Sequence, residues 1–265
     1  AATSDTRVPS NEGSFRPIKV TAPLGSIFNP RAPASAEARF TQCNRMIDLI
    51  IRALAPVMPE KVIAGSSASI SFAAYSGVRP SGDYWVFLEV NEGAYGGRPR
   101  SDGPDCIDNL MANTRNNPLE DLAMHIPMIC DRYELRDDLP PGAGEFRGGI
   151  GVVKAQRVLT PAFITHESER HTDAPWGIFG GQDGTVGRCT ITNPNRPGEV
   201  RDMPSKFSGL AVEADDVMTY YSPNGGGYGN PLNRPPVKVL EDVLDGFCTV
   251  AQAREATGAN ATVIY

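Results

Sequence analysis

YWVFLEVNEGAYGGRPRSDG, residues 84–103, joins a run of apolar residues directly to a glycine-rich loop. The run from Tyr84 to Val90 is dense in β-prone side chains, which predicts a buried strand. The loop that follows contains Gly93, Gly96, Gly97 and Gly103. Glycine lets a backbone turn sharply or come close to a ligand, so this stretch predicts a candidate functional loop on a rigid strand.

Further strands are predicted on both sides of this stretch. Apolar runs between glycines and prolines predict them at 127–135, 150–159, 161–168, 187–193 and 217–221. Residues 62–76 are rich in Ser and Ala and show no clear period. The strands do not alternate regularly with helices. We therefore expect a strand-rich α+β fold with mostly antiparallel or mixed sheets and a few helices, not a doubly wound sheet.

The clearest helix is predicted over residues 36–55. Its apolar residues recur every three or four positions, namely Met46, Ile47, Ile50, Ile51 and Leu54, and Pro56 and Pro59 follow. We expect a second, short helix from Cys106 to Ala112.

Two helices are predicted near the C-terminus. Pro236 suits the first turn of one, with Val237, Leu240 and Leu244 on a shared face and Gly246 at its end. Thr249 and Gln252 have the spacing of a capping box for the other, and Gly258 can end it.

Composition limits the functional classes. The 265 residues carry a net charge of −6, which argues against a nucleic-acid binder. The sequence has no apolar run of about 20 residues that would span a membrane, and residues 1–11 do not resemble a secretion signal. We expect a soluble, cytoplasmic protein. Residues 1–36 hold five prolines and predict an irregular arm, with the main body at 37–265 and a possible subdomain boundary near 140–150.

Cysteine and histidine are sparse. The five cysteines are far apart in sequence, which excludes a CxxC motif and makes a disulfide framework unexpected. Only three histidines occur, so we expect no metal site built wholly from this chain. The sequence lacks a GxSxG elbow and a Walker loop, and GGGYG at 225–229 is not followed by lysine. We expect no ATP site on this chain.

Charged and amide side chains cluster around the glycine-rich loop. Arginines can hold an anion, and a carboxylate can orient an arginine or move a proton. The candidate catalytic residues are Glu89, Asp102 and Arg115. The candidate substrate-binding residues are Tyr95, Gly96, Gly97, Arg98, Asn113 and Asn116. The alternative is that Asp102 and the arginines pair to fix a turn, and that the asparagines cap a helix.

Several motifs occur together in a fixed order. They are NEGSFRPIKVTAPLGSIFNP (11–30), EVNEGAYGGRPRSDG (89–103), NTRNNPLE (113–120), RYEL (132–135), GAGEFRGGIGVV (142–153), PWGIFGG (175–181) and GGGYGNPLNRPP (225–236). In this order they resemble the hydantoinase B/oxoprolinase family, which includes the large subunits of acetone and acetophenone carboxylases.

The resemblance implies an ATP-dependent, multi-subunit enzyme. Family members are about twice as long, and their metal-ligand motifs lie in an N-terminal half that this sequence does not match. We therefore expect a second half of such a subunit, a divalent metal on a partner chain, and an actin-like ATPase subunit that uses ATP and Mg²⁺.

The implied reaction is hydrolysis of a cyclic amide, such as a hydantoin, a lactam or 5-oxoproline. A ketone carboxylase subunit is the first alternative. A non-catalytic scaffold that holds the other subunits together is the second.

Overall fold

Two antiparallel sheets face each other at the centre of the computed structural model, which describes residues 12–35, 39–67, 71–108, 112 and 115–258. The four-stranded sheet has the order β2-β1-β5-β8. Its strands are β1 (Ser71–Val78), β2 (Tyr84–Asn91), β5 (Ala162–Glu167) and β8 (Lys206–Val212). The five-stranded sheet has the order β3-β4-β9-β6-β7. Its strands are β3 (Met128–Leu135), β4 (Val152–Val158), β6 (Arg188–Thr192), β7 (Val200–Met203) and β9 (Val217–Tyr221).

The hydrophobic core lies between the two sheets. Tyr75, Trp85 and Phe87 of the four-stranded sheet pack in one cluster with residues such as Val158 and Met218 of the other. Burying large apolar side chains in this way is the main favourable contribution to folding. The strand-rich α+β fold expected from the sequence is therefore confirmed, and every strand pair in the two sheets is antiparallel.

The strand predictions were mostly correct and failed in three places. All six predicted strands form, but β1, β7 and β8 were missed. In β1 the small residues make room for aromatic neighbours, because a Cβ on Gly77 would lie 2.8 Å from the Trp85 indole nitrogen. A strand with this composition lacks the bulky β-branched signature. The prediction that β2 is buried was half wrong, since Tyr84 and Val86 face outward and are 74 % and 62 % exposed.

The helices are α1 (Glu12–Phe15), α2 (Arg39–Leu54), α3 (Leu119–His125), α4 (Pro236–Leu244) and α5 (Val250–Thr257), with short 3-10 turns at Pro59–Lys61 and Pro231–Asn233. The capping box of α5 and the positive φ of Gly246 and Gly258 confirm the predicted helix ends. The helix expected at 106–112 was wrong for Cys106 to Asp108, which form a bend and an isolated bridge. No helix in the described part is long and apolar enough to cross a membrane.

The predicted apolar faces of two helices are only partly buried. In α4 the buried residue is Val239, whereas Val237 and Leu244 are 60 % and 75 % exposed. In α2 the side chains that are buried are polar, while Leu49 and Ile50 face outward and are 48 % and 51 % exposed. The predicted apolar stripe of α2 is therefore only partly covered by this chain, because Met46, Ile47, Ile51 and Leu54 are half-buried and Ile50 is exposed.

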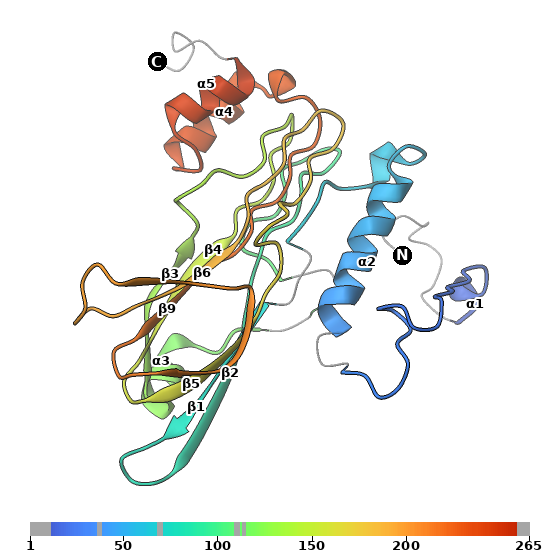
Figure 1. The fold of residues 1–265 in the computed structure, drawn as a ribbon. Helices are drawn as coiled ribbons and strands as arrows, with labels where there is room; N and C mark the ends of the chain where they lie inside the picture. The colour runs from blue at the N-terminus through green and yellow to red at the C-terminus, as the bar shows by residue number, and fades with distance from the viewer. Residues whose placement is uncertain (1–11, 36–38, 68–70, 109–111, 113–114, 259–265) are drawn as a thin grey trace.

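Irregular, glycine-rich segments run from the sheets toward α4 and α5 (Figure 1). We call segments 62–67, 93–104, 142–151, 175–187 and 223–229 the glycine bundle. Lateral backbone hydrogen bonds join them, for example from the Gly97 amide to the Gly226 carbonyl at 2.8 Å and from the Gly225 amide to the Gly149 carbonyl at 2.9 Å. The glycines allow this close packing, since a Cβ on Gly225 would lie 2.0 Å from the Tyr95 carbonyl oxygen.

In the described part of the arm, residues 12–35, α1 is followed by turns and an isolated bridge between Ser26 and Asn29. The division at residue 36 and the boundary near 140–150 stay predictions.

Candidate active site

The inner face of the four-stranded sheet changes from apolar to polar along its strands. Inward-facing residues repeat every second position, so neighbouring strands form rows across the sheet. Phe87, Tyr75 and Ile164 form one row in the register of β2, β1 and β5. The next such row holds Glu89, Ala73 and His166. Two ionisable side chains thus lie in the space between the sheets.

Glu89 is paired across this space with residues of β4. Lys154 and Gln156 both donate hydrogen bonds to its carboxylate. The Tyr75 hydroxyl donates to the Gln156 side-chain oxygen at 2.8 Å. Glu89 is 5 % exposed and Lys154 is 2 % exposed. Removing two charges from water costs several kcal/mol each, so an ion pair here needs a reason other than stability alone.

Tyr133 connects the buried pair to a surface cleft. The Lys154 ammonium lies 4.3 Å from the centroid of the Tyr133 ring, a cation–π contact. On the cleft side, the Asn116 amide donates a 2.6 Å hydrogen bond to the Tyr133 hydroxyl. Burial raises the pKa of Tyr133, and the charge of Glu92 raises it further. Tyr133 is therefore a neutral hydrogen-bond donor near pH 7.

The cleft has a volume of about 290 Å³ and is lined by Val90, Glu92, Cys106, Ile107, Asp108, Asn116 and Tyr133. Glu92 is 9 % exposed, and its Oε2 atom has no hydrogen-bond partner among the described residues. Burial and the charge of Glu92 raise the pKa of the Cys106 thiol. Cys106 also has a φ of +45°, a conformation that costs energy for a non-glycine residue. A carboxylate with an open acceptor can take up a proton, and the neutral phenol beside it can donate a hydrogen bond.

Asp102 belongs to a different group of charges. It accepts hydrogen bonds from Arg234 at 2.7 and 3.1 Å and from the Arg147 amide at 2.8 Å. Arg147 and Arg234 also bind Asp242, and Arg147 binds Asp105. Burial disfavours the charged form of Asp102, but Arg234 outweighs it and lowers the pKa of the carboxyl. Asp102 and Glu89 share no partner in the described part.

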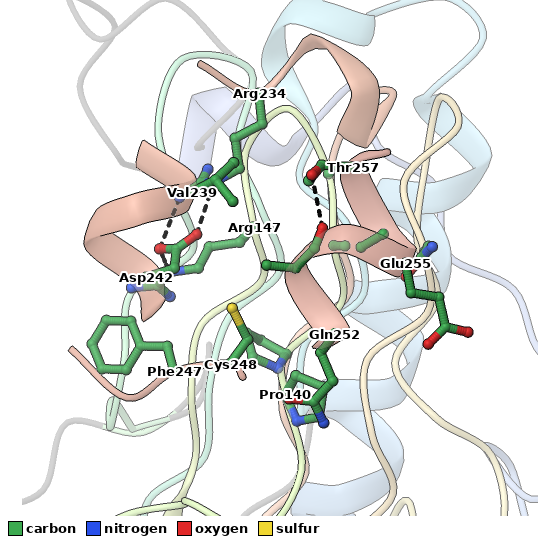
Figure 2. A pocket seen from close by; sticks show the side chains of 16 residues that line it. Pro140, Arg147, Arg234, Val239, Asp242, Phe247, Cys248, Gln252, Glu255 and Thr257 are labelled. Atoms are coloured by element: carbon green, nitrogen blue, oxygen red, sulfur yellow. Dashed lines mark hydrogen bonds and ion pairs between the residues drawn. The ribbon is translucent and has the colours of Figure 1, made fainter. Parts of the chain in front are cut away.

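Arg147, Arg234 and Asp242 line a second cavity under α4 and α5, of about 230 Å³ (Figure 2). Its other walls are largely apolar, with Phe247 and Val239 on the helical side. The Arg147 guanidinium lies 4.5 Å from the centroid of the Phe247 ring. The charged cluster thus connects the C-terminal helices to the glycine bundle. Its members are Asp102, Asp105, Arg147, Arg234 and Asp242.

The loop glycines are packed inside the glycine bundle. The amide of Gly96 donates to the Ser66 hydroxyl, and that of Gly97 to the Gly226 carbonyl. A Cβ would lie 2.1 Å from the Ala64 carbonyl oxygen at Gly96 and 2.4 Å from that of Phe146 at Gly97. The expectation that these amides are open to a ligand was therefore wrong, and the glycines serve close backbone packing.

The remaining candidates lie at or near the surface. Tyr95 is half-buried, and burial raises its pKa. Arg98 is exposed, and its Nε donates to the Asp102 carbonyl at 3.0 Å. Arg115 is exposed next to Asn116, which reaches Tyr133. Asn113 lies outside the described residues. Among the described residues, Lys154 and Tyr133 connect the predicted residues Glu89 and Asn116, whereas Arg98 and Asp102 contact each other separately.

Sequence reasoning missed Lys154, Gln156, Tyr133 and Glu92. A signal for two of them was present in VVKAQRV at 152–158. Period-two alternation puts Lys154 and Gln156 on the same face of the predicted strand as Val158. Two polar residues of this strand are therefore expected to point toward the protein core. Among the described residues, no three His, Cys, Asp or Glu side chains converge to hold a metal ion.

Comparison with known proteins identifies the family to which the chain is similar. The family model for hydantoinase B/oxoprolinase matches residues 1–231. A putative B-type subunit of a D-/L-hydantoinase from Pseudomonas sp. (strain NS671) is 43 % identical over 254 residues, which cover 96 % of this chain and 42 % of that protein.

Two solved structures share the fold. The ATP-dependent caprolactamase from Pseudomonas jessenii has a TM-score of 0.79 at 24 % identity, covering 98 % of this chain and 47 % of its own. An acetone carboxylase has a TM-score of 0.62 at 16 % identity, covering 77 % and 31 %. The chain spans less than half the length of each of these proteins. On the family match and the hydantoinase relative, the chain belongs to the hydantoinase B/oxoprolinase family.

Proposed function

We propose that this chain is part of a cytoplasmic, ATP-dependent enzyme complex that opens cyclic amides. The observation that carries the proposal is the 43 % identity to the putative hydantoinase relative across 96 % of the chain. The caprolactamase with the same fold is described as ATP-dependent, and a lactam is also a cyclic amide. The ring amide is the chemical feature that a hydantoin and a lactam share.

The proposal includes two partners. One is a polypeptide that corresponds to the part of the relatives that this chain does not match, and the other is an actin-like ATPase subunit. The ATPase would phosphorylate the amide oxygen and so make it a leaving group. A divalent metal, when bound outside the described part of this chain, would supply a nucleophilic water at neutral pH.

Residues of the cleft would handle the protons of this reaction. The open Oε2 of Glu92 would accept a proton from an attacking water. The Tyr133 hydroxyl accepts from Asn116 and is hydrogen-bonded to Glu92, and it would turn its proton toward an oxygen that gains negative charge. Arg115, the exposed neighbour of the cleft residue Asn116, would attract an anionic substrate or intermediate. Glu89 would act as a positioning residue, because it fixes Lys154 beneath the Tyr133 ring.

Carboxylation is the weaker alternative. The acetone carboxylase likeness rests on 16 % identity, which supports a common fold and not a common reaction. A scaffold role is disfavoured by the buried Glu89–Lys154 pair and by the open carboxylate oxygen of Glu92, which a purely structural domain does not need.

The test is the activity of the whole complex. The tagged chain is purified from its source together with the chains that bind it, and is offered hydantoin, 5-oxoproline or caprolactam with and without ATP. We expect ring opening that depends on ATP and falls at least tenfold in Glu92→Gln, a barrier increase of about 1.4 kcal/mol. Glu255→Gln, a substitution on α5 away from the cleft, is the matched control. Hydrolysis without ATP, or bicarbonate-dependent loss of acetone, would contradict the proposal.

A further inference from the structure

We infer that the outer face of α2, together with residues 12–35, is the docking surface for the polypeptide that corresponds to the unmatched portion of the hydantoinase relative. The inference rests on the proposed function only in that both require this polypeptide. We define the outer face of α2 by Met46, Leu49, Ile50 and Ala53, together with Val57, which follows the helix.

The side of α2 that faces its own chain is polar. Thr41 and Asp48 are 5 % and 0 % exposed. The Thr41 hydroxyl donates to Glu167 at 3.0 Å, and Arg170 donates to Asp48 at 2.5 Å. Burial raises the pKa of Asp48 to about 6 although Arg170 and Arg45 act against it. A surface helix normally buries its apolar stripe and keeps its polar side chains in water. In α2 the buried side chains are polar, whereas Ile47 and Ile51 are only half-buried and Leu49 and Ile50 are exposed.

Apolar side chains on the outer face of α2 are exposed to solvent. Leu49, Ile50 and Val57 are 48 %, 51 % and 74 % exposed. Removing such side chains from water is the main favourable term in most protein association. From Met46 to Ala53 this face extends about 11 Å along the helix, so it offers a short apolar ridge for a partner helix or sheet.

The arm adds apolar surface at the same edge of the molecule. Its exposed large apolar side chains are Ile18, Val20, Leu24, Ile27 and Phe28. Figure 1 shows α2 and the arm on one side of the sheets, and α4 and α5 at another end. Exposed apolar side chains gathered on one side of a molecule are typical of a protein interface.

The comparisons favour one occupant over others. The match to the hydantoinase relative leaves more than half of that protein without a counterpart here. A portion of that size can supply the roughly 800 Å² per partner that a stable interface needs. Asp48 and Arg45 of α2 pair with Arg170 and Glu169 of the same chain, and the exposed Arg52 lies over the Trp176 ring. The surface around Leu49 and Ile50 therefore suits an apolar partner face. A second copy of this chain is the alternative that the experiment must separate.

The test measures assembly and not turnover. The chain is co-expressed with the unmatched portion of the Pseudomonas sp. relative, and complex formation is followed by size exclusion with light scattering. We expect a one-to-one complex for the wild type, and at least tenfold weaker binding for the double variant Leu49→Glu/Ile50→Glu. Leu244→Glu on α4, 75 % exposed in the same way, is the matched control and should bind like the wild type.

Folding is checked separately. Because Leu49 and Ile50 are exposed in the isolated chain, the double variant should keep its circular dichroism and melt within about 2 °C of the wild type. Three results would overturn the inference: no complex with the wild type, equal binding by the double variant, or a homodimer that the variant splits and the second polypeptide does not displace. A complex that assembles as expected but opens no cyclic amide would overturn the proposed function and leave this surface intact.

Discussion

Lys154 of β4 and Glu89 of β2 form an ion pair between the two sheets, where both side chains are almost completely shielded from water. The pair stands where the inward-facing rows change from apolar to polar. Two other groups complete it: Gln156 donates to the same carboxylate, and the Tyr133 ring lies against the ammonium. Because the pair lies beside the cleft, we infer that it fixes the position of the Tyr133 ring.

The first prediction concerns the stability of this pair. Lys154→Met leaves a buried carboxylate without its cation, and we expect a loss of about 3–5 kcal/mol in the free energy of unfolding. Glu89→Gln/Lys154→Met removes both charges and should recover most of that loss. Urea denaturation of the wild type, the two single variants and the double variant gives the coupling energy. If the double variant is as unstable as Lys154→Met, the charges are not coupled as the structure indicates.

The second prediction separates two roles for Asp102. Its carboxylate holds Arg234, which also binds Asp242 of α4. We expect Asp102→Asn to lower the free energy of unfolding by about 2–4 kcal/mol, because two buried guanidinium contacts lose their anion. Turnover of the assembled complex should fall only as far as the folded fraction falls. A tenfold loss of turnover at unchanged stability would instead support a catalytic role.

The third prediction is a pH dependence that comes from His166. Its Nδ1–H donates to the Phe72 carbonyl at 2.9 Å, and its Nε2 has no partner among the described residues. Burial lowers its pKa to about 3, and His171 contributes to the shift. The unfolded chain takes up a proton near pH 6.5 that the folded chain does not. This contribution to stability is therefore complete above pH 6.5 and is lost as pH falls toward 3.

The contribution of His166 is measured as the difference in slope between the wild type and His166→Asn from pH 6 to pH 5, because Asp48, with a pKa of about 6, and His171, whose pKa is also lowered, titrate in the same range. The linkage relation gives a stability loss approaching 1.4 kcal/mol per pH unit for one such histidine. His166→Asn should change the slope by that amount, while His125→Gln, whose side chain is 65 % exposed, should leave it as in the wild type. An unchanged slope in His166→Asn would mean that another group controls the transition.

The fourth prediction tests the glycine bundle. A Cβ at Gly225 would lie 2.0 Å from the Tyr95 carbonyl oxygen, and backbone cannot move aside as a side chain can. We expect Gly225→Ala to cost more than about 3 kcal/mol or to prevent folding. Gly209→Ala is the control, because nothing lies within 4 Å of its added Cβ and only its φ of +62° opposes the change. That variant should cost about 1 kcal/mol. Similar losses in both would show that the bundle is loosely packed.

The local patterns predicted much of the fold. Apolar runs located six strands because β-branched and aromatic side chains fit a half-buried pleated surface. The capping box at Thr249 and Gln252 located the start of α5 from local chemistry alone. Strand β1 was not predicted because a small residue such as Gly77 is needed to make room for Trp85. Trp85 becomes its neighbour only after β1 and β2 pair. A requirement imposed by a distant neighbour leaves no period in the sequence.

The site was harder to predict than the fold. Glycine-rich sequence suggested an open loop, but the atoms that those glycines approach are backbone carbonyls of other segments. Amphipathicity showed that α2 is a helix with an apolar face, but it could not show which face the chain itself would cover. Lys154 reaches Glu89 across 65 residues of sequence, and no spacing rule connects residues that far apart.

The last prediction concerns Arg115. Its side chain is exposed next to Asn116, which holds the Tyr133 hydroxyl at the cleft. A solvated arginine contributes little to stability, so Arg115→Ala should change the melting temperature by less than about 2 °C. If Arg115 holds an anionic substrate or phosphorylated intermediate, turnover of the assembled complex should fall at least tenfold, a barrier increase of about 1.4 kcal/mol. Arg254→Ala, an exposed arginine of α5, should leave turnover unchanged. Equal effects of the two substitutions would show that Arg115 is an ordinary surface residue and that the reacting anion lies elsewhere.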